Sequence, residues 1–132
     1  MSETGAIPYY SYALNGITLA IGSALIYTGV WGTFVNPLSL AKFFGLPTAT
    51  RENVVLFPSS TGRNLGAGIF VWILTLLGER RTLGIFLLCW SWAGIADTKI
   101  LYEHPRGQDK WMHVRNILIL WTLGPLLIRS AA

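Results

Sequence analysis

The sequence has few charged residues. They make up 12% of its 132 residues, and hydrophobic residues make up 52%, whereas a soluble globular domain carries about 25% charged residues. A soluble domain of this length must cover a large surface with water-compatible side chains, and so few charges cannot do that. The mean hydropathy of +0.49 agrees. The composition therefore argues against a soluble enzyme and a disordered chain, and it indicates a protein that lies in lipid.

Cysteine and clustered basic residues are also scarce. Cys89 is the only cysteine, which excludes an internal disulfide and a zinc site built from cysteines. The net charge is +4, but the basic residues are scattered and lack the basic face that a nucleic-acid partner requires. No nucleotide or flavin motif is present, and the His and Asp residues make a poor set of metal ligands. We therefore expect no nucleic acid, no cofactor and no metal.

Long runs without charge predict membrane helices. No charged residue occurs between Glu3 and Lys42, and this run exceeds the about 20 apolar residues that a membrane-spanning helix needs. Three later stretches without charge are shorter than this, and each reaches the length of a membrane-spanning helix only if a charged residue is included at one end. The predicted fold is an all-α integral membrane four-helix bundle, with residues 1–132 as a single transmembrane domain. Its four spans are placed at approximately residues 9–31, 58–78, 82–102 and 111–129.

The longest connection, between the first and second spans, contains the segment NPLSLAKFFGLP. Its Asn-Pro pair is typical of a helix start, and the Gly and Pro that follow are typical of a helix stop. The apolar residues between them share one face. We predict a short amphipathic helix that lies in the membrane interface or re-enters the mouth of the bundle.

The basic residues predict an orientation. Four spans put both termini on one side of the membrane. The first and third connections, with the helix ends beside them, carry Lys42, Arg51, Arg63, Lys99, Arg106, Lys110 and Arg115, whereas the side of the termini carries Arg80, Arg81 and Arg129. By the positive-inside rule the two connections face the cytoplasm. The membrane is the endoplasmic reticulum in a eukaryotic source and the inner membrane in a bacterial one.

Three of the predicted spans carry polar residues at a common depth. Arg63 lies five residues into the second span, and Asp97 lies five residues before the end of the third. At a rise of 1.5 Å per residue, both lie roughly 7–8 Å below the same interface. His113 and Asn116 lie in the first turns of the fourth span and share a face. Ionisable groups inside a membrane usually face the bundle interior or a wet cavity, so we predict that these residues meet in one site.

The residue types suggest a chemistry for this site. Asp97 is the candidate general acid or base, Arg63 the candidate ligand of a carbonyl, carboxylate or developing oxyanion, and His113 the candidate proton relay. The candidate substrate-binding residues are Asn64, Asn116, Trp90 and Gly94. Structural roles are the alternative: Arg63 and Asp97 as an ion pair that fixes helix packing, His113 as an ordinary interfacial histidine, and Gly94 as a point of close helix packing.

Several short motifs resemble a known family over roughly residues 12–128. They are FFGLP, GRNLGAGIF, GERRTLG, Asp97 followed by TKIL, Gly107 and His113. The sequence resembles domain-of-unknown-function family 4267, small four-helix membrane proteins of bacteria and fungi whose fungal members tend to be associated with natural-product biosynthesis. The resemblance implies that Arg63, Asp97, Gly107 and His113 are motif positions, but it implies no reaction. The family usually has an Asp after this Arg, so Asn64 departs from its pattern.

Three classes of function remain open. The first is a cofactor-independent isomerase or cyclase that acts on a lipophilic natural-product intermediate, with the lipid bilayer and a hydrophobic small molecule as its partners. The second is a non-enzymatic scaffold or accessory subunit that holds pathway enzymes at the membrane, alone or as a homo-oligomer. The third is a transporter, which four short spans form only by oligomerisation and for which no inverted repeat is evident.

Overall fold

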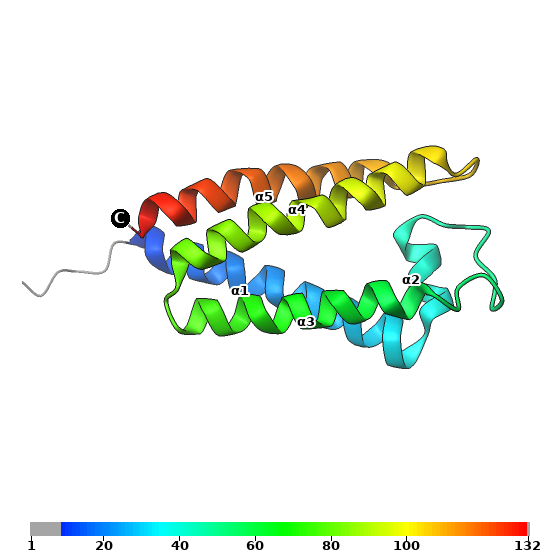
Figure 1. The fold of residues 1–132 in the computed structure, drawn as a ribbon, viewed down its shortest axis with the longest axis horizontal. Helices are drawn as coiled ribbons and strands as arrows, with labels where there is room; N and C mark the ends of the chain where they lie inside the picture. Colours follow the sequence, from blue (N-terminus) through cyan, green and yellow to red (C-terminus); the bar gives the residue numbers. More distant parts are fainter. Residues whose placement is uncertain (1–8, 132) are drawn as a thin grey trace, which may run out of the picture.

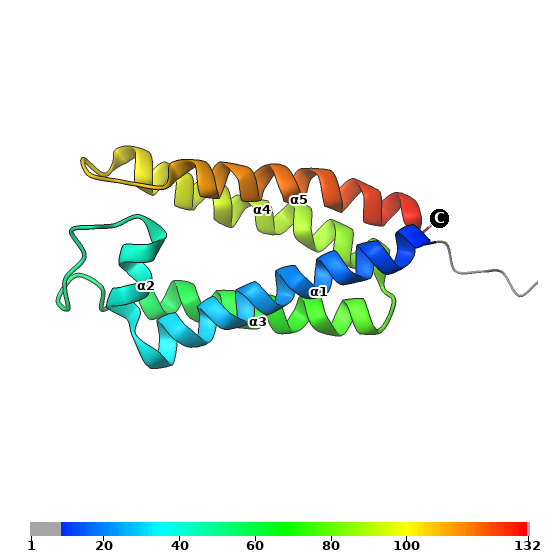
Figure 2. The same ribbon diagram turned by 180° about the vertical axis from the view of Figure 1, so that it is seen from behind.

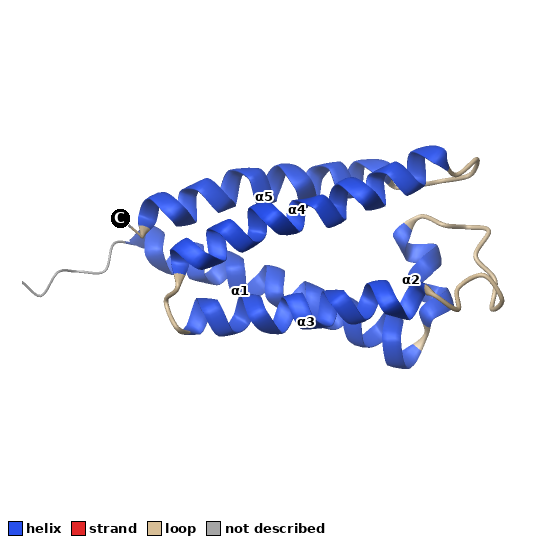
Figure 3. Ribbon diagram, in the orientation of Figure 1, coloured by secondary structure: helices blue, strands red, loops and turns tan. Residues whose placement is uncertain are grey.

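Every regular element in the described part of the chain, residues 9–131, is a helix in the computed structural model (Figures 1 and 3). The elements are α1 (Tyr9–Val30), which continues into the π-helical turn η1 (Trp31–Val35), α2 (Pro37–Phe44), α3 (Phe57–Leu76), α4 (Arg80–Glu103) and α5 (Lys110–Ser130). The predicted all-α bundle with a short helix between the first and second long helices is confirmed. Residues 1–8 and 132, which belong to the predicted single domain, lie outside the described residues.

The short helix α2 begins and ends where the sequence predicts. The side chain of Asn36 accepts a hydrogen bond of 2.9 Å from the backbone N–H of Ser39, and Pro37 occupies the first turn. Both are ordinary features of a helix N-terminus. The helix stops at Gly45, whose φ of 120° is a conformation that residues with a side chain rarely adopt.

The four long helices form two antiparallel pairs, α1 with α3 and α4 with α5 (Figures 1 and 2). Glycines let the backbones of each pair approach closely. A Cβ atom on Gly68 of α3 would lie 2.6 Å from the carbonyl oxygen of Gly22 in α1. In the same way, a Cβ atom on Gly84 of α4 would lie 2.5 Å from the carbonyl oxygen of Gly124 in α5. A glycine contact thus holds each pair together.

The two pairs converge at the end of the bundle where α3 turns into α4. The buried core lies there and consists mainly of leucines, namely Leu14, Val71, Leu74, Leu83, Leu87, Leu120, Leu123 and Leu127. The guanidinium of Arg80 adds hydrogen bonds across the pairs, to the hydroxyl and carbonyl oxygens of Ser11 at 2.9 and 3.3 Å and to the side chain of Asn15 at 3.3 Å. Apolar burial and this arginine therefore fix α4 against α1.

At the opposite end the two pairs diverge, and α2 with its following loop bridges them (Figure 2). The backbone N–H of Gln108 donates to the carbonyl of Gly45 at 2.9 Å. Nδ1 of His104 accepts from the N–H of Arg106 at 3.2 Å, so the ring donates through Nε2 to the hydroxyl of Thr48 at 2.9 Å. The open end of the bundle is thus closed by α2 and its loop, through these hydrogen bonds and through the buried apolar residues Leu40, Ala41 and Leu101.

Three helical segments among residues 9–131 are long and apolar enough to cross a membrane: Tyr9–Val35, Arg80–Glu103 and Lys110–Ser130. They indicate an integral membrane protein. α3, which corresponds to the predicted span at 58–78, is not one of the three, and its first half is polar, with the sequence SSTGRN. α3 starts at the end of the bundle where α1 stops and finishes where α4 starts (Figure 1). This path predicts that α3 returns across the membrane between α1 and α4.

Candidate functional site

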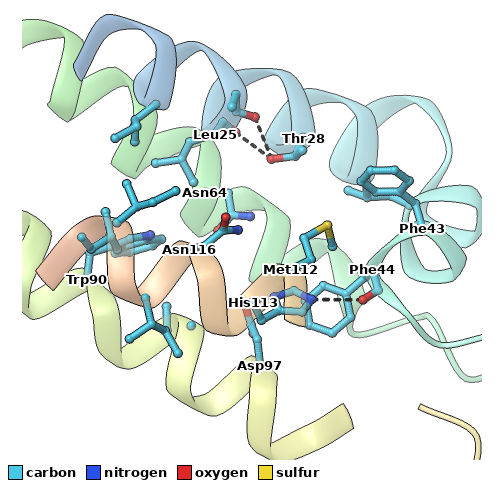
Figure 4. Close-up of a pocket in the computed structure, with 18 residues that line it drawn as sticks. Leu25, Thr28, Phe43, Phe44, Asn64, Trp90, Asp97, Met112, His113 and Asn116 are labelled. Carbon is cyan, nitrogen blue, oxygen red and sulfur yellow. Dashed lines mark hydrogen bonds and ion pairs between the residues drawn. The ribbon is translucent and has the colours of Figure 1, made fainter. Parts of the chain in front are cut away.

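A cavity of about 290 Å³ lies between the two helix pairs, toward the end that α2 closes (Figure 4). Side chains from α1, α2, α4 and α5 form most of its wall, and α3 contributes Asn64. The lining is mainly aliphatic and aromatic. Apart from the indole N–H of Trp90, its polar side chains are Thr28, Asn64, Asp97, His113 and Asn116. An apolar cavity with a few converging polar groups is the usual form of a small-molecule site.

Asp97 of α4 and His113 of α5 meet on this wall. Oδ2 of Asp97 lies 3.9 Å from Nδ1 of His113, and the two side chains are 29% and 9% exposed. His113 lies on the buried stripe of α5, one and two turns before Ile117 and Leu120, so the packing of α5 turns its ring inward. The structure thus brings a carboxyl group and an imidazole from neighbouring helices to one point of an apolar cavity.

The backbone of α2 fixes the imidazole of His113. Nε2 lies 3.1 Å from the carbonyl oxygen of Phe44, and because a carbonyl oxygen only accepts, Nε2 carries the hydrogen of this bond. The ring of Phe44 also packs on the imidazole, with 4.5 Å between ring centroids. In the neutral ring, the lone pair of Nδ1 then faces Asp97. The arrangement leaves one nitrogen free to accept or return a proton.

The four predicted substrate-binding residues also line the cavity. Asn64 and Asn116 present their amides to it, and Trp90 closes the end toward the leucine core (Figure 4). Gly94 has a packing role as well, since a Cβ atom there would lie 2.9 Å from Cγ1 of Ile117 on α5. The cavity wall at Gly94 is therefore also a close contact between α4 and α5.

Arg63 is placed differently from the other predicted site residues. It is exposed, does not line the cavity, and donates to the hydroxyl of Ser60 at 3.3 Å. Within residues 9–131 it makes no ion pair with Asp97, although its charge is within electrostatic range of that carboxyl group. Arg63 lies at the predicted end of α3, but its side chain is not part of the cavity wall.

The contribution of α1 to the cavity was not predicted from the sequence. Ile21, Ala24, Leu25 and Thr28 line the cavity from this helix at spacings of three and four residues, which put them on one face. The spacing was visible in the sequence. This spacing did not identify the residues that line the cavity, because α1 has apolar residues on every face. The stripe that faces the cavity therefore has the same composition as the faces toward lipid.

Gly107, a motif position without a predicted role, has a structural one. A Cβ atom there would collide with the carbonyl of Leu101, and the N–H of Gly107 donates to the carbonyl of His104 at 3.0 Å. This glycine lets the α4–α5 connection fold back against α4. Among residues 9–131, no group of three or more His, Cys, Asp or Glu side chains is arranged to hold a metal ion.

The fold and its cavity define a small all-helical membrane protein with three candidate spans. The chain belongs to the family described as domain of unknown function (DUF4267), whose model matches residues 22–127. The match confirms the resemblance seen in the sequence, and it includes every cavity residue except Ile21. No curated protein and no solved structure matches the chain.

Proposed function

We propose that this protein is a cofactor-independent isomerase or cyclase that moves a proton on a lipophilic natural-product intermediate. One observation carries the proposal: Asp97 and His113 lie 3.9 Å apart on the wall of an apolar cavity between membrane helices. Ionisable residues are costly inside a membrane bundle, and those present there commonly serve a function.

The pair supplies the two groups that an isomerisation needs. One group removes a proton from a C–H bond next to a carbonyl or alkene, and the other returns a proton at a second atom, so that the product has the same atoms as the substrate. Asp97, on the cavity wall, is the group that contacts the substrate. His113 holds or returns the second proton through Nδ1, because Nε2 is occupied by the carbonyl of Phe44. No electron is transferred in such a reaction.

The rest of the cavity fits a neutral lipophilic substrate. The amides of Asn64 and Asn116 can donate to an oxygen on which negative charge develops during the reaction. The apolar side chains around them hold the hydrocarbon part and keep water from the reacting atoms. Arg63, outside the wall, acts on the site through its charge and does not contact the substrate.

The test is metabolite profiling of a strain that lacks the gene, complemented with the wild type, with Asp97→Asn or with Glu103→Gln. The control residue Glu103 is an exposed carboxylate that pairs with Lys99 at 2.7 Å, outside the cavity. We expect a precursor that the wild type and Glu103→Gln clear and that Asp97→Asn leaves, at equal protein level and thermal stability. Clearance by Asp97→Asn at the wild-type rate would refute the proposal.

A scaffold or accessory subunit is the second candidate. The loop before α3 exposes Val55 and Leu56, which are 73% and 77% accessible, and such a surface suits contact with another protein or with lipid. A scaffold would keep its function in the double variant Arg63→Leu/Asp97→Leu, provided that the bundle remains folded. Substrate flux across proteoliposomes without chemical conversion would instead identify a transporter.

A further inference from the structure

A second hollow lies on the outer face of the seam between α1 and α5. This groove has a volume of about 380 Å³ and is lined mainly by apolar side chains, with Arg115 among them. Ile17, Leu118 and Leu126 in its wall are about half exposed, at 46%, 55% and 49%. In a membrane-spanning bundle such a surface faces the hydrocarbon of the bilayer.

The groove adjoins the cavity. Ile119 of α5 lines both. On α1, Leu14 and Ile17 line the groove, and the next residues on the same face, Ile21 to Thr28, line the cavity. Their spacing of three and four residues makes one continuous stripe. From Leu14 to Thr28 this stripe extends about 21 Å along the helix at 1.5 Å per residue.

The α1–α5 seam is the side on which the cavity adjoins the outer groove. On the α3–α4 side, Phe70, Phe86 and Trp90 form a row of aromatic contacts, with ring centroids 5.0 and 5.8 Å apart. At the loop end, α2 is bonded to the α4–α5 pair. The backbones of α1 and α5 approach each other closely at few points, and Ile119 on the seam is 42% exposed.

The size of the cavity limits what it can hold. At about 290 Å³ it lies at the lower end of the roughly 300–1,000 Å³ usual for small-molecule sites. It has room for the reacting end of an elongated lipophilic molecule and not for a long chain as well. A hydrocarbon tail in the groove loses little by leaving the bilayer, because lipid chains and leucine side chains are similarly apolar.

We infer that the substrate enters sideways from the bilayer through the α1–α5 seam, past Ile119, and that its tail remains in the outer groove while its head reacts. This inference rests on the proposed function, because the occupant of the seam is the substrate of that reaction. The molecule is an elongated lipophile with one neutral polar end, a carbonyl or a hydroxyl. A neutral end fits because the cavity wall carries the carboxyl group of Asp97 and no arginine or lysine.

The test uses two photoactivatable long-chain methyl ketones with purified protein in lipid nanodiscs. One carries a diazirine next to the carbonyl, and the other carries it near the end of the tail. After irradiation, mass spectrometry identifies the labelled peptides. We expect the first probe to label the cavity segment of α5, residues 112–117, and the second to label the groove segments at 14–17 and 118–126.

Variants at the seam show whether the probe passes it. Ile119→Trp fills the passage between groove and cavity, and we expect it to reduce cavity labelling by the first probe at least tenfold. Ile119→Ala leaves the passage open and should retain that labelling. Ile85→Trp makes the same change on an exposed isoleucine of α4, 49% accessible and outside both hollows, and should have no effect.

The outcomes separate this inference from the proposed function. Cavity labelling that is equal in the wild type and Ile119→Trp would overturn the lateral route, whatever the profiling of Asp97→Asn shows. Labelling by both probes confined to the groove would also overturn it, and would make the groove a site for bilayer lipids beside Arg115. A third outcome is that Ile119→Trp abolishes cavity labelling but the wild-type protein converts no precursor. This result would support the lateral route and refute the isomerase.

Discussion

The imidazole of His113 touches two elements at once. Nδ1 faces Asp97 of α4, and Nε2 donates to the carbonyl of Phe44 at the end of α2. The same side chain therefore belongs to the proposed reactive pair and holds α2 over the cavity. These two contributions can be measured separately, because stability does not depend on turnover.

His113→Ala should lower the stability of the protein. The carbonyl of Phe44 loses its donor, at a cost of about 1–3 kcal/mol for a group left without a partner, and the Phe44 ring loses the imidazole on which it packs. The measurement is the midpoint of thermal unfolding in detergent. His113→Gln, which keeps an N–H donor, should unfold closer to the wild type. An alanine variant with an unchanged midpoint would mean that His113 does not hold α2.

Arg80 and Arg81 are a matched pair for testing the contact between α4 and α1. Arg80 donates to Ser11 and Asn15, whereas Arg81 is exposed. Hydrogen bonds from a charged group are worth about 1.5–3 kcal/mol, and partial exposure of Arg80 reduces this value. We expect Arg80→Ala to lose about 1–2 kcal/mol of unfolding free energy and Arg81→Ala to lose almost none. Equal losses in both variants would contradict this role.

Sequence position predicts how deep a residue lies in a span better than it predicts the side to which the residue points. The rise per residue puts Arg63 and Asp97 toward the same end of the bundle. The face to which a side chain points depends instead on how its helix packs against the others, which position along the span does not determine. Asp97 lines the cavity and Arg63 does not.

At the scale of helices, the sequence predicted where each helix lies but not which helices pair. Charge-free runs and the Asn-Pro and Gly signals mark the boundaries of α1 and α2. The tight turn around Gly78 suggests that α3 and α4 are partners, yet α3 packs mainly on α1 and α4 on α5. Lipid-facing and buried surfaces of a membrane helix are similarly apolar, so the hydrophobic pattern does not reveal the packing face.

The glycine contacts within the two pairs give a test of this pairing. Gly68→Ala and Gly84→Ala place a methyl group against the backbone of the partner helix, and overpacking of this kind costs about 1–3 kcal/mol. Both should lower the midpoint of thermal unfolding. Gly16→Ala and Gly66→Ala are the controls, since a Cβ atom there meets nothing within 4 Å. They should be neutral or slightly stabilising, and a loss as large as that of Gly68→Ala would argue against the pairing.

For the whole molecule, the path of the chain predicts that α3 crosses the membrane with the three candidate spans. Single cysteines at Glu52→Cys, in the loop before α3, and Glu79→Cys, in the turn after it, test this in a Cys89→Ser background. Both positions are exposed. A membrane-impermeant maleimide should label them from opposite sides, with residue 52 facing the cytoplasm under the positive-inside rule. Labelling of both from one side would remove α3 from the set of spans.

The two ends of the bundle are held together by different means. At one end a short turn and a leucine core join the helix pairs, and at the other the short helix α2 and its loop join them through hydrogen bonds and apolar contacts. Under the proposed function, a substrate wider than the cavity would displace α2, a helix of eight residues, before it displaced the long helices. The upper limit on substrate width is then set by this one small element.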